Sequence, residues 1–269
     1  GLLIAFFTVT IAIGLYCRKH STDVNGFVLG GRSVGPWLTA FAYGTSYFSA
    51  VVFVGYAGQF GWKYGIAATW AGIGNALLGS LMAWAFLGRR TRVMTQHLDS
   101  ATMPQFFEAR FNNRSLKLAA SVLIFIFLIP YTASLYNGLS RLFGMAFDID
   151  YSVCVIVMAV LTAVYVIAGG YMATAINDFI QGIIMIIGII SVIAAVLSGG
   201  GGFMESIKGL AKIEGDFPGA YASFFGPDPL GLLFVVILTS LGTWGLPQMV
   251  QKFYAIKSEK AINKGMIIS

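Results

Sequence analysis

The chain has 269 residues, of which 57% are hydrophobic and 10% charged, and its mean hydropathy is +0.79. Because soluble domains carry about 25% charged residues, this composition excludes a soluble globular protein and predicts a polytopic membrane protein. The net charge of +6 does not indicate nucleic-acid binding, because the basic residues are divided among loops without a stripe of interleaved aromatic residues.

Apolar runs predict seven membrane-spanning helices, since a helix needs about 20 mostly apolar residues to cross a bilayer. All seven belong to one transmembrane domain that covers residues 1–269. The chain begins and ends within apolar runs, at Gly1 and Ser269, and we interpret it as a fragment of a longer protein. We expect the spans near residues 1–17, 34–57, 67–88, 116–146, 151–168, 174–198 and 230–250.

Basic residues predict the orientation of these spans. With the N-terminus outside, thirteen of the 17 Lys and Arg residues lie in cytoplasmic segments, among them Arg32, Arg92 and Lys252. Cytoplasmic loops of membrane proteins are rich in Lys and Arg. We therefore expect a multi-pass protein of the plasma membrane, surrounded by lipid, with the N-terminus of this chain outside.

The second span is interrupted near its middle by glycine and hydroxyl side chains, in the segment from Tyr43 to Ala50. A helix that breaks inside a membrane frees backbone carbonyls, and transporters use such carbonyls to bind Na⁺. The alternative is a packing face of small residues, which lets membrane helices approach closely. We favour the break, since Gly and Ser pairs are common kink sites.

Two connecting segments have amphipathic patterns. Residues 102–111 alternate apolar and charged positions, which predicts a short interfacial helix. Residues 203–213 predict a second short amphipathic piece in a loop outside the membrane.

Asp178 lies in the sixth apolar run, shortly after Gly169-Gly170 and close to Gln181. Acidic residues inside membrane spans are rare and mark functional sites by default, which favours an ion site. The alternative is a carboxylate near the start of its helix, where free N–H groups and the helix dipole favour negative charge.

Four segments carry a resemblance to the sodium:solute symporter family, in the order and at the spacing of that family. The resemblance implies an all-α, polytopic transmembrane helical bundle with the LeuT-like fold of two inverted repeats of five helices. Residues 34–198 would form the first repeat and the helix at 230–250 would open the second, as in the N-terminal half of a longer transporter. The four segments are residues 27–33, the interruption at 44–49, residues 169–181 and residues 245–253.

The resemblance also implies a sodium site. In the family, carbonyl groups of the broken helix bind Na⁺ together with hydroxyl groups of a later helix. These carbonyls fall to Thr45 and Phe48, and Asp178 matches an acid that contributes to a further cation site in some members. Na⁺ is the expected coupling ion, and no organic cofactor is expected.

Substrate contacts in the family come from the broken helix, the helices that follow it and the first helix of the second repeat. Asn75 has an alternative interpretation, an interhelical hydrogen bond. Proline transporters of the family carry an acid where this chain has Tyr47, and sialic acid transporters carry an arginine in the fourth span, so neither solute is expected. The matching positions are Ser46, Tyr47, Ser49, Asn75, Tyr131, Ser134, Thr239 and Thr243.

We therefore expect a sodium-coupled secondary active symporter that imports a small organic solute by alternating access. The alternative is a symporter-like sensory input domain of a membrane histidine kinase, because some kinases resemble symporters fused to signalling modules. An enzyme is not expected, since the spans contain no paired carboxylates, Ser-Lys dyad or metal-binding histidine pattern.

Overall fold

The computed structural model describes residues 2–48 and 56–269. Regular structure within these residues is helical apart from one parallel bridge between Val34 and Ile256, which confirms the predicted all-α class. Three helical stretches are long and apolar enough to cross a membrane, and shorter apolar helices accompany them, as in a multi-pass membrane protein. The long stretches are Ala57–His97, Arg114–Phe147 and Tyr151–Gly199.

The N-terminal part consists of an apolar helix followed by short turns. Asp23 caps α2, since its carboxylate accepts the Gly26 N–H at 3.2 Å. Gly30 and Gly31 then adopt positive φ angles of 57° and 63°, which end α2 and aim Arg32 into the protein. The elements are α1 (Leu2–Cys17), η1 (Arg18–His20), α2 (Val24–Leu29) and η2 (Gly30–Arg32).

The expected second span begins as α3 (Pro36–Tyr47) and does not continue as one helix. Pro36 occupies the first turn, where its missing N–H costs nothing. Gly44 lies in regular helix, because its carbonyl accepts the Phe48 N–H at 2.9 Å. Phe48 has non-helical angles, φ −88° and ψ 65°. The predicted interruption therefore lies one turn after Gly44.

A long, irregular helical stretch follows in residues 57–97. Gly65, with φ 61° and ψ −140°, separates α4 from the rest of the stretch. The η5 and η6 segments are π-helical, a wider coil that is often found at functional sites. The elements are α4 (Ala57–Tyr64), η4 (Gly65–Ala68), α5 (Thr69–Gly74), η5 (Asn75–Leu81), η6 (Trp84–Gly88) and α6 (Arg89–His97).

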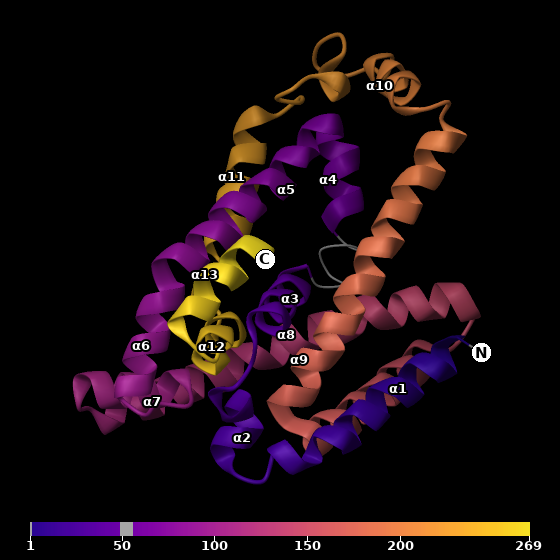
Figure 1. Cartoon of the computed structure of the whole chain (residues 1–269). Coiled ribbons are helices and arrows are strands. Elements are labelled where there is room, and N and C mark those ends of the chain that lie inside the picture. Colours follow the sequence, from indigo (N-terminus) through magenta and orange to yellow (C-terminus); the bar gives the residue numbers. More distant parts are fainter. Residues whose placement is uncertain (1, 49–55) are drawn as a thin grey trace.

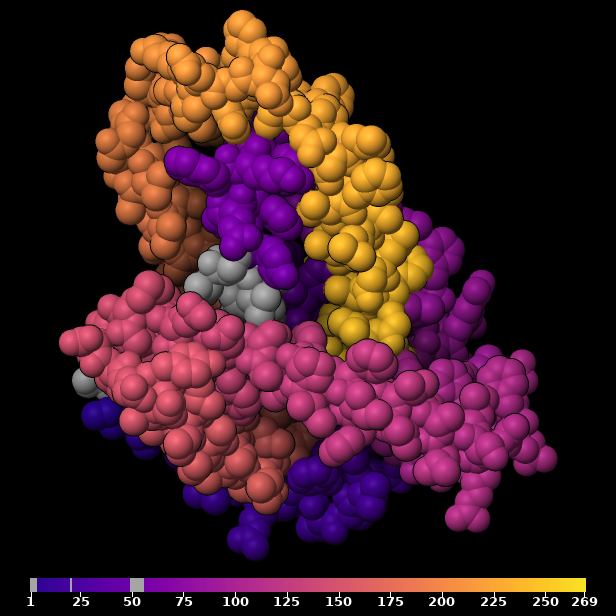
Figure 2. Space-filling model, turned by 180° about the vertical axis from the view of Figure 1, so that it is seen from behind, coloured from indigo at the N-terminus to yellow at the C-terminus, as the bar shows by residue number. Residues whose placement is uncertain are grey.

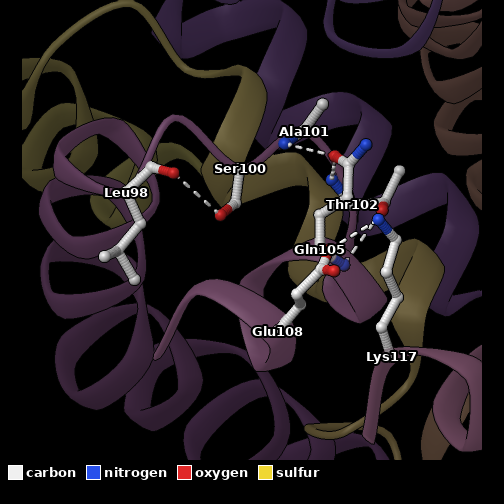
Figure 3. A network of polar contacts seen from close by, with 7 residues as sticks. All are labelled: Leu98, Ser100, Ala101, Thr102, Gln105, Glu108 and Lys117. Carbon is white, nitrogen blue, oxygen red and sulfur yellow. Dashed lines mark hydrogen bonds and ion pairs between the residues drawn. The ribbon is translucent and has the colours of Figure 1, made fainter. Parts of the chain in front are cut away.

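The short helix predicted at residues 102–111 is confirmed as α7 (Met103–Phe111). Gln105 donates its backbone N–H to the Thr102 hydroxyl, and its side-chain oxygen accepts the N–H groups of Ala101 and Thr102 (Figure 3). Glu108 forms an ion pair with Lys117 of the next helix, α8 (Arg114–Phe147). The capping hydrogen bonds define the start of α7. The ion pair holds α7 against the start of α8.

The expected spans 151–168 and 174–198 lie in one bent element, α9 (Tyr151–Gly199), whose two arms meet at Gly170. Gly170 has φ 59° and ψ −152°, and a Cβ there would lie 2.8 Å from the Phe27 carbonyl oxygen. The sharp turn in α9 thus requires glycine for its angles and for the close approach of α2.

The segment expected as one helix at 230–250 is divided in the structure, which corrects that prediction. α11 (Pro229–Leu241) ends before a turn, and α12 (Pro247–Ala255) starts after Leu246, whose ψ of 127° is extended. A residue before proline is sterically disfavoured in the helical region, so Pro247 accounts for the break. The remaining elements are α10 (Phe203–Ala211), which confirms the amphipathic piece, η7 (Ala220–Ala222) and α13 (Glu259–Ile268).

In Figure 1, α1 runs along the first arm of α9, while α3 lies between the second arm of α9 and the α12–α13 pair. Helix α11 packs beside α5 and η5. Figure 2 shows from behind that α7, α8 and the first arm of α9 form a band across the molecule, below α10 and α11. An aromatic group of Tyr43, Trp84 and Phe253 fills the core where α3, η6 and α12 meet.

Candidate functional site

A neutral group of polar side chains joins the ends of α3 and α11 through η5. We call Tyr47, Asn75, Thr239 and Ser240 the Asn75 cluster. The Asn75 side-chain oxygen lies 2.6 Å from the Tyr47 hydroxyl and accepts the Ser240 hydroxyl at 3.3 Å. The Asn75 amide group donates to the Thr239 hydroxyl at 3.1 Å and to the Ala71 carbonyl at 2.6 Å. Asn75 thus uses both of its polar atoms, which is how a buried carboxamide is stabilised.

Glycines of the α5–η5 stretch allow this close approach. A Cβ added at Gly79 would overlap the Tyr47 hydroxyl, and one added at Gly74 would overlap the Val236 side chain of α11. Small residues of this kind let membrane helices approach closely enough for interhelical hydrogen bonds. The glycines in this stretch therefore determine where Tyr47 and α11 can sit.

Both α3 and α11 end at this cluster. Tyr47 is the last residue of α3, and its hydroxyl lies 2.9 Å from the carbonyl of Thr239, in the last turn of α11. The turn after α11 is held by Trp244, whose indole N–H donates to the Leu78 carbonyl at 3.0 Å. Two interrupted helices thus meet at one polar cluster.

Thr45 and Phe48, predicted to supply carbonyls to a cation, line a cavity of about 430 Å³ between α3 and the second arm of α9. Gly182 forms part of the opposite wall, and Ser269 lies at its edge. The Thr45 hydroxyl donates to the Phe41 carbonyl of its own helix at 2.8 Å. The hydroxyl hydrogen of Thr45 is thus used within its own helix.

Asp178 lies away from the first turn of its helical arm, two turns beyond the kink at Gly170, so the helix-start interpretation is wrong. Its carboxylate forms an ion pair with Lys252 of α12, with 3.6 Å between Oδ2 and Nζ. We call this the inner ion pair. The Lys252 side chain is 9% exposed and the Asp178 side chain 24%. The Lys252 ammonium also lies 5.5 Å from the centre of the Tyr171 ring.

Two further basic residues, Arg32 and Arg92, also pack inside the protein. The sequence predicted both in cytoplasmic segments. Arg32 donates to the carbonyls of Ser100, Thr95 and Tyr254 at 2.8, 3.1 and 3.4 Å. Arg92 donates to the Ile256 carbonyl at 2.6 Å. Burial lowers the pKa of Arg32 from its usual value, and nearby Asp99 opposes that shift. We call Arg32 and Arg92 the arginine clasp, because they tie the ends of α6 and α12 to η2.

The structure brings together part of the predicted solute site. Tyr47, Asn75 and Thr239 are in contact, and Thr243 lies one turn beyond Thr239 with its hydroxyl on the Ser240 carbonyl. Ser46 is half-buried in the last turn of α3, and Ser49 lies outside the described residues.

Tyr131 and Ser134 lie on α8, where the exposed Ser134 hydroxyl donates to the Tyr131 carbonyl. Among the described residues, no side-chain hydrogen bond joins these two positions to the Asn75 cluster. The predicted sodium positions are divided as well. Thr45 and Phe48 share the α3–α9 cavity, whereas Asp178 pairs with Lys252 one turn before Gly182.

Sequence reasoning missed Lys252, Ser240 and the arginine clasp. The burial of Lys252 could have been predicted from the sequence. Pro247 marks the start of a helix, and Lys252 lies within the amphipathic pattern of that helix. Ser240 and the clasp had no such signal, since their roles depend on partners far away in the sequence.

Comparisons with known proteins agree with this geometry. The model of the sodium:solute symporter family matches residues 27–269. The chain is similar to sodium/proline symporter 2 of Staphylococcus saprophyticus, with 33% identity over 98% of this chain and 51% of that protein. It is also similar to the sodium/proline symporter of Staphylococcus aureus, with 32% identity over 98% of this chain and 51% of that protein. The chain thus spans about half the length of the curated relatives it matches.

Proposed function

This chain belongs to the sodium:solute symporter family, and we propose that it is part of a sodium-coupled symporter that imports a small organic solute by alternating access. The observation that carries the proposal is the meeting of two interrupted helices, α3 and α11, at the Asn75 cluster. Discontinuous helices place substrate and ion sites where their ends meet, because the freed backbone groups and nearby polar side chains can bind ligands there.

The Asn75 cluster suits a small polar solute. It offers the Asn75 carboxamide at the start of η5 and three hydroxyl groups near the ends of α3 and α11, all within hydrogen-bond distance of the carboxamide. A solute with a hydrogen-bond donor and an acceptor can take the place of partners within the cluster. Few polar groups of the cluster are then left without a hydrogen bond, so the exchange costs little free energy. Ser46 and Thr243 extend the proposed solute site from the same helix ends, and Ser49 lies outside the described residues. Tyr131 and Ser134 are not used in it.

Two of the proposed cation positions, Thr45 and Phe48, flank Tyr47 of this site in the sequence. The backbone carbonyls of Thr45 and Phe48 would bind Na⁺ at the α3–α9 cavity, and Asp178 would contribute a carboxylate further along α9. A bound cation at the end of α3 would hold Tyr47 in place for the solute. By linkage, solute and cation then raise each other's affinity by the same factor.

The relatives are named sodium/proline symporters, and nothing in the comparisons supports the sensory alternative. Their names also make proline the first solute to test, although Tyr47, Thr239 and Thr243 differ from the pattern expected of a proline site.

The test is solute uptake by the full-length protein in proteoliposomes. We expect uptake to rise with an inward Na⁺ gradient and to vanish when choline replaces Na⁺. Proline and a panel of other small polar solutes should be compared under both conditions, with Asn75→Leu as the binding-site variant. Uptake that is equal in Na⁺ and choline would refute sodium coupling, and uptake that is unchanged in Asn75→Leu would refute the solute site.

A further inference from the structure

The inner ion pair places two opposite charges in a largely buried contact between α9 and α12. Lys252 is nine-tenths buried, and its ammonium stands 3.6 Å from the Asp178 carboxylate. Charge-assisted hydrogen bonds are shorter, about 2.7–2.9 Å. The attraction is therefore mainly electrostatic, and the ammonium neutralises the acid without being locked to it by an ideal hydrogen bond.

Polar groups without partners lie on the same two elements. The Tyr171 hydroxyl and the Asn177 amide nitrogen on α9, and both amide atoms of Gln248 on α12, are buried and have no hydrogen-bond partner among the described residues. Gln248 and Lys252 are four residues apart on α12, and Tyr171 and Asp178 are seven apart on α9, so each pair shares a helix face. These faces carry more donors and acceptors than the ion pair uses.

We propose, resting on the proposed symport function, that Lys252 is a tethered competitor of the coupling cation at Asp178. When no Na⁺ is bound at this position, the ammonium neutralises the carboxylate. A Na⁺ ion that reaches Asp178 displaces the ammonium, because both cations cannot occupy one carboxylate without strong repulsion at this distance. The Tyr171 ring next to the ammonium offers the displaced charge a favourable aromatic face.

This exchange has a mechanical consequence. Asp178 belongs to α9, in the first part of the chain, and Lys252 belongs to α12, which follows the break after α11. Displacing Lys252 removes the ionic link between these elements. A conformation in which α12 has moved away from α9 therefore binds Na⁺ at Asp178 more tightly, and by linkage bound Na⁺ favours that conformation.

The experiment measures the Na⁺ concentration for half-maximal effect in the full-length protein, by uptake in proteoliposomes and by thermal protection of the purified protein in Na⁺ against choline. Lys252→Met removes the competing charge at similar side-chain length. We expect it to lower the half-saturating Na⁺ concentration about fivefold or more, the lower end of ordinary coupling between sites. Lys252→Arg should raise that concentration, because a guanidinium pairs with a carboxylate through two hydrogen bonds.

If Lys252→Met fails to fold, the rise in half-saturating Na⁺ concentration expected for Lys252→Arg still tests the proposal. Lys260→Met, on the exposed side of α13, is the matched control for loss of one basic residue and should leave the Na⁺ dependence unchanged. In an Asp178→Asn background, Lys252→Met should have no further effect on the half-saturating concentration.

Two results would overturn the proposal while sodium coupling stands. One is a sodium-dependent wild type whose half-saturating concentration moves with neither Lys252 variant, or moves in the same direction with both. The other is an equal shift by Lys252→Met with and without the Asp178 carboxylate. A wild type with no Na⁺ effect on uptake or on thermal protection would instead overturn the proposed function and this inference together.

Discussion

The Asn75 cluster and the inner ion pair both connect the earlier helices to the α11–α12 segment, yet they are built from different chemistry. The Asn75 cluster is neutral, and its carboxamide has partners for both polar atoms. The inner ion pair is charged, and buried polar atoms on the same helices have no hydrogen-bond partner in the described part of the chain. A neutral, satisfied network can exchange its hydrogen bonds with a polar solute, whereas a charged contact responds to ions. On this difference we propose solute recognition at the Asn75 cluster and cation sensing at the inner ion pair.

The largest expected effect comes from removing one member of the inner ion pair. Asp178→Asn leaves the Lys252 ammonium buried without a counter-charge, which we expect to cost about 3 kcal/mol of folding stability, the lower end for a buried pair. The Asp178→Asn/Lys252→Met double variant removes both charges and should recover most of that loss. Thermal unfolding in detergent with choline checks this. A double variant that is less stable than both single variants would show that the charges do not depend on each other.

A smaller effect is expected where the Asn75 cluster depends on glycine. Gly79→Ala places a methyl group at the Tyr47 hydroxyl, so Tyr47 must leave the cluster. We expect a loss of about 1–3 kcal/mol from overpacking and a marked fall in solute uptake. Gly72→Ala on α5 is the matched control, because its Cβ would meet no atom within 4 Å. Equal uptake by both variants would argue against Tyr47 as a solute contact.

Tyr47→Phe tests the hydrogen bonds of the cluster without changing its packing. The variant removes the hydroxyl that approaches Asn75 and Thr239 and keeps the ring stacked against Tyr43. We expect only about 0.6 kcal/mol of lost stability, the average for interhelical hydrogen bonds in a membrane protein. The solute concentration for half-maximal uptake should rise while the Na⁺ dependence stays the same. A change in Na⁺ dependence alone would place Tyr47 at the cation and not at the solute.

The smallest effect is expected for Thr45→Ala. The Thr45 hydroxyl donates to carbonyls of its own helix, so its removal leaves the backbone carbonyl where it was. The folding stability should stay within about 0.5 kcal/mol of wild type. The half-saturating Na⁺ concentration should stay within about twofold of wild type. A strong loss of Na⁺ dependence would show that the hydroxyl, not the carbonyl, binds the cation.

Local sequence features predicted much of the fold because their causes are local. Apolar composition identified the long helices, and the alternation of apolar and charged positions in residues 102–111 and the amphipathic residues 203–213 marked α7 and α10. The break in α3 falls at Phe48, within the interruption predicted for residues 43–50. One boundary was misplaced, because Pro247 divides the segment expected as one helix. Counting apolar residues alone does not register such a break.

The candidate site was predicted in part. Tyr47, Asn75 and Thr239 were named from their positions in the family pattern, and they meet in the structure. Asp178 was singled out because an acid in an apolar run is costly, but its partner was assigned to a cytoplasmic loop. A basic residue near the end of an apolar segment looks solvated until the packing of the next helix is known.

The sequence by itself determined the membrane class and the family, because composition and motif spacing are properties of the sequence alone. Only the tertiary structure decided that Lys252 faces Asp178, that Ser240 completes the Asn75 cluster and that the arginine clasp grips backbone carbonyls. Each of these contacts joins residues that are distant in the chain. They exist because α9 bends sharply at Gly170 and α11 stops before Pro247, which brings faces together that no local pattern relates.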